Sequence, residues 1–356
     1  MKTRVCDQRS GQSGFSLIEI MVGMVIGLLA IIVMMQVFAA SEERKRTANA
    51  GSDAQNSAVI ALDGIQRDIG QSAYGFAMTR LLGCNLQLPF GAPVPLAPVI
   101  INPPVAVIPA GDANTDTLLV SYGLGNDQPD GYNVLSQSGT TYTIVGTSML
   151  RVGDRVVAAP AACGATTLVL GTVQAVNASV VQLSTSAAGT ALFNLGATPR
   201  FLAYAVRNGN LVVCDYMAAN CGDATAASLA NPAIWRLVAE NIASLRAQYG
   251  QDTSGPPMDG TVDAYNQTTP ATACLWARTP AIRLALVARS AQFEKENVTL
   301  AAPQWSGSTS PTPVVIGAPT NPDGTPDALW QRYRYRVFET VVPIRNVAWM
   351  GAVSGC

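Results

Sequence analysis

One long apolar run near the start of the chain sets the strongest limit on its fold. Residues 15–40 carry a single charge, Glu19, and follow a short leader that contains Lys2, Arg4 and Arg9. As a helix with 1.5 Å rise per residue, this run would be about 39 Å long and would cross a bilayer core of about 30 Å. The basic leader favours insertion with the N-terminus in the cytoplasm. We therefore expect a membrane helix with the remainder of the chain on the far side.

The position of Glu19 predicts a partner for its carboxylate. A charged side chain at the centre of a membrane helix costs roughly 2.5–3.5 kcal/mol on insertion scales. A favourable interaction with the helix dipole at the N-terminus is the alternative. A secretory signal is cut after its apolar core, whereas here the small residue, Gly14, precedes that core. Cleavage at Gly14 would leave the apolar segment on the mature chain; a plain signal anchor is the other interpretation.

The start of the apolar run resembles the prepilin signal of type IV pilins and type II secretion pseudopilins, in the stretch GFSLIE of residues 14–19. The resemblance implies that a prepilin peptidase cuts between Gly14 and Phe15, and that the new Phe15 amine is methylated. It also implies a partner for Glu19, namely the terminal amine of a neighbouring subunit in the filament. Such a pair offsets the cost of burial because opposite charges attract strongly at low dielectric constant.

Composition narrows the chemistry of the rest of the chain. Histidine is absent, which excludes Ser-His-Asp and Cys-His catalysis and every metal site that needs histidine. Neither a Gly-x-Ser-x-Gly motif nor a phosphate-binding loop occurs, so we expect no enzyme and no cofactor. The net charge of −1 creates no overall positive potential that would attract nucleic acid, so we expect no nucleic-acid partner. Only 13% of residues are charged, and 31 glycines and 22 prolines favour long loops and short strands.

The cysteines predict disulfides. An even number of cysteines follows the leader, in a segment expected outside the cytoplasm, where disulfides persist. Six cysteines allow 15 pairings, and only Cys214 with Cys221 is favoured by closeness in the sequence. A tetrathiolate metal site is the alternative, but no C-x-x-C pair exists, so we expect no metal. The six residues are Cys84, Cys163, Cys214, Cys221, Cys274 and Cys356.

The membrane helix is predicted to continue beyond the membrane. No proline occurs between residues 48 and 74, and Val59, Leu62, Ile65 and Ile69 recur there at helical spacing. We expect this amphipathic half to pack on a globular domain, with two helices separated at Gly51 as the alternative. The predicted organisation is a prepilin leader (1–14), a transmembrane and filament-core helix (15–40), an amphipathic continuation (41–76) and a periplasmic β-rich globular domain (77–356).

Beyond the helix the sequence predicts short strands separated by turns. Asn208-Gly209-Asn210 predicts a hairpin turn. Residues 85–111 are proline-rich and predict an extended loop, whereas residues 251–273 and 302–327 predict polar surface loops. Residues 240–246 fit helix or strand. The predicted strands are 117–122, 140–145, 151–158, 167–176, 180–184, 201–207, 211–215, 279–290 and 333–344.

Two loops contain aspartates at spacings that partly resemble calcium loops. An EF-hand needs acids at positions 1, 3 and 5, glycine at 6 and glutamate at 12. Loop 112–116 supplies the first three positions, but Thr117 and Gly123 occupy the last two. Loop 252–263 does not meet the spacing. We expect both loops to be polar turns.

Several separate segments resemble the PilW family of minor pilins: residues 62–74, 235–242, 248–250, 282–290 and 335–346. With the helix and strand pattern, this resemblance implies an α+β fold, in which a pilin-like long N-terminal helix packs on an antiparallel β-sheet with β-rich insertions. One insertion, beginning near residue 150, is expected to be a compact antiparallel subdomain.

The resemblance also implies a function. A minor pilin of this family is a structural subunit that helps to start assembly of the type IV pilus within a tip complex, and pili serve cell adhesion and twitching motility. The implied partners are other minor pilins, the major pilin, the prepilin peptidase and a tip adhesin. The implied location is the inner membrane, with a single pass and a periplasmic C-terminal domain, and then the extracellular pilus.

Two other functions stay open, a J-like pseudopilin of type II secretion and a pilus-tip binding module for surfaces or DNA. The pseudopilin that caps a filament commonly lacks the acid that matches Glu19, so Glu19 predicts a place below the topmost subunit. Arginine and tyrosine alternate over residues 332–336, a pattern that suits single-stranded nucleic acid. On a strand the same alternation places the arginines on one solvated face, which is the interpretation we favour.

Overall fold

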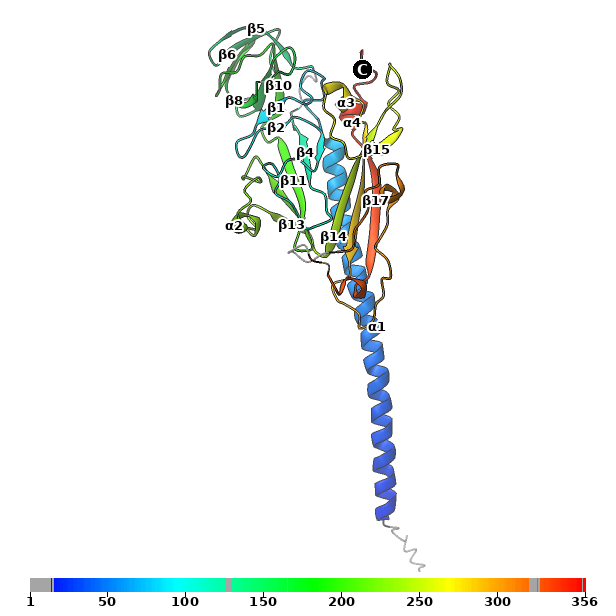
Figure 1. Ribbon diagram of the computed structural model, residues 1–356. Coiled ribbons are helices and arrows are strands. Elements are labelled where there is room, and N and C mark those ends of the chain that lie inside the picture. The colour runs from blue at the N-terminus through cyan, green and yellow to red at the C-terminus, as the bar shows by residue number, and fades with distance from the viewer. Residues whose placement is uncertain are drawn as a thin grey trace, which may run out of the picture. The chain divides into compact units, whose positions relative to one another are not determined.

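The computed structural model describes residues 14, 16–125, 130–164, 166–319, 325, 327–353 and 355–356. Helix α1 runs from Leu17 to Gln71 without interruption, so Gly51 lies inside it and the alternative of two separate helices is wrong (Figure 1). The chain divides into two compact units, Met1–Ala50 and Gly51–Cys356.

The first unit contains the apolar half of α1. Its segment Leu17–Ala39 is 23 residues long, has a mean hydropathy of 2.8, and buries none of its residues within the protein. By length and composition this segment can cross a membrane. So large an apolar surface requires lipid or other helices around it.

In the second unit, the remainder of α1 buries one stripe of residues. Ala58, Leu62, Ile65 and Ile69 are each at most 8% exposed and follow the i, i+4, i+7, i+11 spacing of a helix face. The predicted stripe is therefore confirmed except at Val59, which is 50% exposed. Val59 lies about 100° around the helix from Ala58, because each residue advances the helix by that angle.

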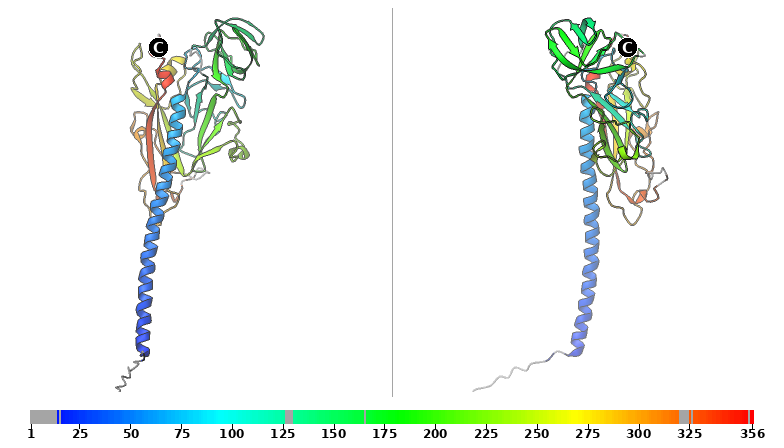
Figure 2. Two further views of the ribbon diagram at one scale, coloured as in Figure 1. Left: turned by 180° about the vertical axis from the view of Figure 1, so that it is seen from behind. Right: turned by 90° about the vertical axis from the view of Figure 1, so that its left-hand side faces the viewer.

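Two antiparallel sheets share a core with this stripe (Figure 2). The five-stranded sheet has the order β13-β12-β11-β4-β3, and the four-stranded sheet has the order β15-β14-β16-β17. The predicted α+β fold, with the helix packed on antiparallel sheet, is thus confirmed. The strands are β3 (Val99–Ile101), β4 (Leu118–Tyr122), β11 (Arg200–Arg207), β12 (Asn210–Asp215), β13 (Arg236–Ala239), β14 (Ile242–Gln251), β15 (Ala264–Asn266), β16 (Ala281–Arg289) and β17 (Tyr335–Pro343).

A third sheet closes into a six-stranded barrel. Its order β8-β7-β10-β5-β6-β9 returns to β8 through the β8–β9 pairing, and every pair around it is antiparallel. Its separate core includes Tyr142, Val173 and Leu192. The barrel is inserted between β4 and β11, which pair directly. Its strands are β5 (Tyr132–Ser138), β6 (Thr141–Ile144), β7 (Arg155–Ala159), β8 (Leu168–Asn177), β9 (Val180–Leu183) and β10 (Ala191–Gly196).

Three segments predicted as loops contain more structure than expected. Residues 251–273, predicted as a polar loop, contain β15, which pairs with β14. In the proline-rich segment, β1 (Asn85–Gln87) and β2 (Val94–Pro95) extend the barrel sheet, and β3 forms an edge of the five-stranded sheet. Edge strands tolerate proline because one side needs no hydrogen-bond donor. The predicted polar loop 302–327 buries Trp305, Val314 and Ile316 against β16. Polar residues on either side of these three apolar residues made this small third core hard to recognise in the sequence.

The remaining helices are short. They are α2 (Ala226–Leu229), α3 (Ala273–Ala277), α4 (Arg345–Ala348) and the 3₁₀ turns η1 (Ser306–Thr309) and η2 (Trp330–Arg332). The ambiguous stretch 240–246 is strand from Ile242, where β14 pairs with β16. The predicted hairpin is confirmed, since β11 and β12 pair from Arg207 and Asn210 onward with Asn208 and Gly209 at positive φ.

Three disulfides join segments at the ends of these sheets: Cys84–Cys163, Cys214–Cys221 and Cys274–Cys356. The pair favoured by closeness in the sequence, Cys214 and Cys221, is among them. Cys84 lies just before β1, and Cys163 lies in the β7–β8 connection. The Cys84–Cys163 bond therefore ties the barrel to the segment that follows α1.

Replacing both Cys84 and Cys163 by alanine is expected to lower the free energy of unfolding by about 2–4 kcal/mol, because the bond closes a long loop. The two cysteines are 79 residues apart. Urea unfolding of the full chain in detergent, followed by tryptophan fluorescence, measures the change. Removing Cys214–Cys221, whose cysteines are 7 apart, serves as the comparison. Its expected loss is about 2 kcal/mol smaller on chain entropy alone. Equal losses would contradict that account.

Candidate assembly surfaces

The N-terminal signal lies at the start of α1. Gly14 is exposed, and a Cβ atom added to it would meet nothing within 4 Å. Phe15, the other residue of the predicted cleavage site, lies outside the described residues. Glu19 is in the first turn of α1 and is exposed, and it has no ion pair with the rest of the described chain. Its carboxylate is therefore available to another molecule.

A groove of about 490 Å³ separates α1 from the edge strand β17. Ile60 on α1 is 72% exposed beside it, and Phe338 lines it from the strand. Gln66 Nε2 donates to Thr340 Oγ1 at 2.7 Å and holds the helix to the strand. Asp63 and Glu339 also line the groove, so apolar and acidic side chains share it.

A larger cavity of about 590 Å³ lies just beyond the C-terminal end of α1. Met78, Trp349 and Met350 line it, and Trp349 is 80% exposed. Asn346 Nδ2 donates to Gln71 O at 3.1 Å and to Ser72 O at 2.9 Å, which satisfies carbonyl groups left free where the helix ends. Exposed tryptophan beside an apolar cavity is typical of protein interaction sites.

One carboxylate fixes α1 to the five-stranded sheet. Asp68 accepts a hydrogen bond from Tyr122 Oη at 2.8 Å and a second from Tyr204 Oη. Burial raises the pKa of both tyrosine hydroxyls well above its ordinary value, and the negative charge of Asp68 and the hydrogen bonds to it raise it further. Asp68 lies outside the apolar stripe of the helix, yet it is half-buried, and the two hydroxyls satisfy its charge.

The buried tyrosines predict alkaline unfolding. Burial raises the pKa of five of the ten tyrosines, for Tyr249 to about 12. Each of these tyrosines has a higher pKa in the folded chain than its value of about 10 in the unfolded chain, so its neutral form stabilises the fold. This stabilisation is fully present below pH 10 and is lost as the pH rises towards the folded pKa. We therefore expect the free energy of unfolding to fall above pH 10, and ionisation of these tyrosines to coincide with loss of near-ultraviolet circular dichroism. Ionisation of all ten near pH 10 with the dichroism intact would contradict this. The five are Tyr122, Tyr204, Tyr216, Tyr249 and Tyr335.

A second carboxylate joins the five-stranded and the four-stranded sheets. Asp116 precedes β4 and is 2% exposed. It pairs with Arg246 Nη1 at 3.1 Å and accepts from Ala247 N at 2.9 Å, both on β14. Asn102 Nδ2 and Gln267 Nε2 also donate to it, at 2.9 and 2.7 Å. Four donors thus compensate for the burial of its charge.

The two aspartate loops weighed for calcium use their carboxylates internally. Asp112 accepts from the backbone amides of Asn208 and Gly209, at 2.9 and 2.7 Å, and Asp116 pairs with Arg246. In the other loop, Asp252 accepts from Gly260 N at 2.7 Å. Among the described residues no group of three or more histidine, cysteine, aspartate or glutamate side chains is placed to hold a metal ion. The carboxylates shape turns.

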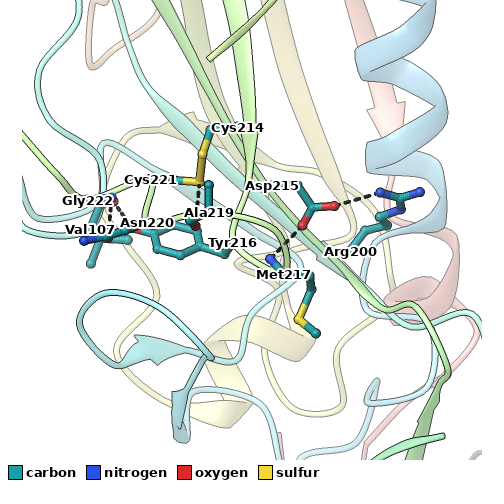
Figure 3. The surroundings of a disulfide bond; sticks show 10 residues. All are labelled: Val107, Arg200, Cys214, Asp215, Tyr216, Met217, Ala219, Asn220, Cys221 and Gly222. Carbon is teal, nitrogen blue, oxygen red and sulfur yellow. Dashed lines mark hydrogen bonds and ion pairs between the residues drawn. A yellow bond between two sulfur atoms is a disulfide. The ribbon is translucent and has the colours of Figure 1, made fainter. Parts of the chain in front are cut away.

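The Cys214–Cys221 bond closes a tight loop after β12 (Figure 3). Next to it, Asp215 pairs with Arg200 at 2.7 Å and accepts from Met217 N at 2.9 Å. The hydroxyl of Tyr216 donates to the carbonyl of Val107. The disulfide therefore stabilises a polar corner of the five-stranded sheet.

The predicted alternation of arginine and tyrosine is only partly strand. β17 begins at Tyr335, and Arg332 belongs to η2, so the prediction that three arginines share a strand face is wrong. Arg334 and Arg336 are exposed, whereas Tyr335 packs against the small core around Trp305. The 3₁₀ turn η2 ends at Arg332, just before the predicted strand 333–344, and β17 begins two residues later than predicted.

Two parts of the chain match known protein families. Residues 9–35 match the prokaryotic N-terminal methylation motif, and residues 204–346 match the family described as type IV pilus-assembly protein W. No curated protein and no solved structure matches the chain.

The apolar first half of α1 and the methylation motif define a pilin-like protein that is made as a prepilin, consistent with anchoring in the inner membrane. Over residues 204–346 the chain is similar to the PilW family of type IV pilus assembly proteins. PilW-family pilins are structural proteins and not enzymes. Assembly of a type IV pilus implies other pilins and the prepilin peptidase as partners.

Proposed function

We propose that this protein is a minor pilin that helps to start assembly of the type IV pilus as part of a minor-pilin complex at its tip. The observation that carries the proposal is the joint occurrence of the methylation motif and the PilW match in one chain. The large β-rich unit supports a specialised subunit, because it adds a closed barrel, an apolar cavity and a groove of mixed polarity to the helix.

The N-terminal residues have defined roles in this proposal. The peptidase removes the leader, residues 1–14, after Gly14, and the amine of Phe15 becomes methylated. In the membrane and then in the filament core, the carboxylate of Glu19 pairs with the amine of an adjoining subunit. The globular unit, within residues 77–356, lies in the periplasm before assembly and on the pilus afterwards. Because Glu19 is retained, another subunit lies above this one.

Affinity capture of the tagged chain from solubilised membranes tests the proposal. Other pilin-like subunits, and a tip adhesin if the complex includes one, should be recovered with it. A Glu19→Gln variant should be processed normally but recovered with fewer partners, since the amide cannot form the ion pair. Recovery of type II secretion components in place of pilins would favour a J-like pseudopilin. Recovery of neither set would refute assembly as its role.

A further inference from the structure

One end of the four-stranded sheet carries a surface that the proposed function leaves unused. Two segments, residues 289–300 and 327–336, lie side by side there (Figure 1). Backbone hydrogen bonds join them, such as the bond from Glu294 N to Arg332 O at 2.8 Å. We call these two segments the arginine surface.

The arginine surface is basic in a chain that is slightly acidic. It contains five basic and three acidic side chains, whereas the whole chain has a net charge of −1. Positive charge is therefore concentrated at this end of the unit. The residues are Arg289, Lys295, Arg332, Arg334 and Arg336, with Glu294, Glu296 and Asp327.

A pocket of about 300 Å³ within this surface has a lining that suits an anion. Arg289, Arg334 and Arg336 line it and no carboxylate does. Arg334 pairs with Glu294 at 3.0 Å, outside the lining, while Arg336 has no ion pair within the described chain. Arg289 Nε and Tyr335 Oη are buried beside it, and neither has a hydrogen-bond partner among the residues described. Unsatisfied buried donors point to a missing anionic partner.

The same two segments also expose apolar side chains. Leu300 is 83% exposed, Phe293 59% and Leu329 44%. Exposed apolar side chains combined with arginine and lysine are typical of surfaces that enter the headgroup region of a membrane. An anion in solution would not account for these side chains.

The chain itself tethers this surface to the membrane segment. Gln55 of α1 lines the pocket, and it lies fifteen residues after Ala40, which ends the apolar run. Fifteen residues span at most about 50 Å, even when fully extended. Anionic lipid is therefore at high local concentration around the pocket whenever the apolar segment is in a bilayer.

We propose that the arginine surface binds phosphate groups of anionic phospholipids on the membrane that anchors the chain before assembly. Guanidinium groups bind phosphate through paired, charge-assisted hydrogen bonds, and Phe293, Leu300 and Leu329 insert between headgroups. The contact rests on the proposed membrane stage. Extraction of the subunit into a pilus would break this contact with the lipid. Lipid binding therefore keeps the globular unit at the membrane until assembly begins.

The test uses the full chain, with its leader removed, in nanodiscs of phosphatidylcholine alone or mixed with phosphatidylglycerol. Hydrogen exchange of residues 289–300 and 327–336 reports the contact. We expect slower exchange only in the discs with phosphatidylglycerol, and less protection as salt is raised. Each arginine near an anionic surface contributes roughly fivefold, so Arg334→Gln with Arg336→Gln should weaken the contact about thirtyfold.

The matched control replaces Arg151 and Arg236, which are exposed elsewhere, by glutamine and should leave the protection unchanged. Equal protection in both kinds of disc, or equal loss in both double variants, would overturn the assignment to anionic lipid. Absence of protection in every disc would also overturn it and would favour an acidic protein partner. Retention of the chain in the discs is scored separately, because failure to insert would count against the proposed membrane stage itself.

Discussion

Replacing Gly14 by valine is expected to leave the prepilin uncut and to exclude it from the pilus. An added Cβ meets nothing within 4 Å, so the substitution acts on recognition by the peptidase and not on the fold of the chain. Without cleavage the amine of Phe15 stays in a peptide bond, and no charged terminus exists there to pair with an acid. Immunoblots of membranes and sheared pili measure both effects: a longer chain in the membrane and none in the pilus.

Ser16→Ala is the matched control, because Ser16 is also exposed and lies two residues beyond Gly14. This variant should be cut and assembled like the original chain. Normal processing of Gly14→Val would contradict the assigned cleavage site. Processing that fails in both variants would show only that the peptidase reads the whole stretch.

Replacing Asp116 by alanine is expected to lower the free energy of unfolding by about 3–5 kcal/mol, since it leaves Arg246 buried without its counter-ion. The loss should be large because Asp116 also accepts hydrogen bonds from the backbone N–H of Ala247 and from the side-chain amides of Asn102 and Gln267. These bonds join the five-stranded sheet to β14, so the substitution removes several polar contacts between the two sheets. Urea unfolding of the full chain in detergent measures the change.

Asp63→Ala provides the comparison. Asp63 also pairs with an arginine, Arg67, but the two side chains are 50% and 73% exposed. Exposed pairs one helical turn apart contribute only about 0.3–0.5 kcal/mol. If both alanine variants lose the same stability, burial does not determine the strength of the Asp116 contact.

Local patterns were sufficient to predict the helix and most of the strands. The apolar run, the absence of proline as far as residue 74 and the stripe at Leu62, Ile65 and Ile69 together specify α1 and its buried face. The hairpin at Asn208 and Gly209 follows from residues that adopt positive φ. Such features depend on neighbours in the sequence, which is why a single sequence reveals them.

Features that depend on distant contacts could not be predicted. β5 (Tyr132–Ser138) is mostly exposed and polar, and its strand conformation comes from pairing with β6 and β10. In the sequence Asp68 falls on the polar side of the helix. Nothing there indicates that the hydroxyls of Tyr122 and Tyr204 donate hydrogen bonds to it. Nothing in the sequence indicated that Cys84 pairs with Cys163 either, because the fold of the barrel brings the two cysteines together.

The inserted barrel begins and ends at neighbouring positions of one sheet. Tyr122 on β4 pairs with Arg200 on β11, so the chain leaves the five-stranded sheet and re-enters it at the same rung. The match to the PilW family begins at residue 204, after the barrel has ended. An insertion with adjoining ends can be lengthened, exchanged or removed without changing the register of the host strands. A replacement for the barrel would keep the register of β4 and β11, but it would also have to replace the β1–β8 pairing and the Cys84–Cys163 bond, which tie the barrel to the segment after α1.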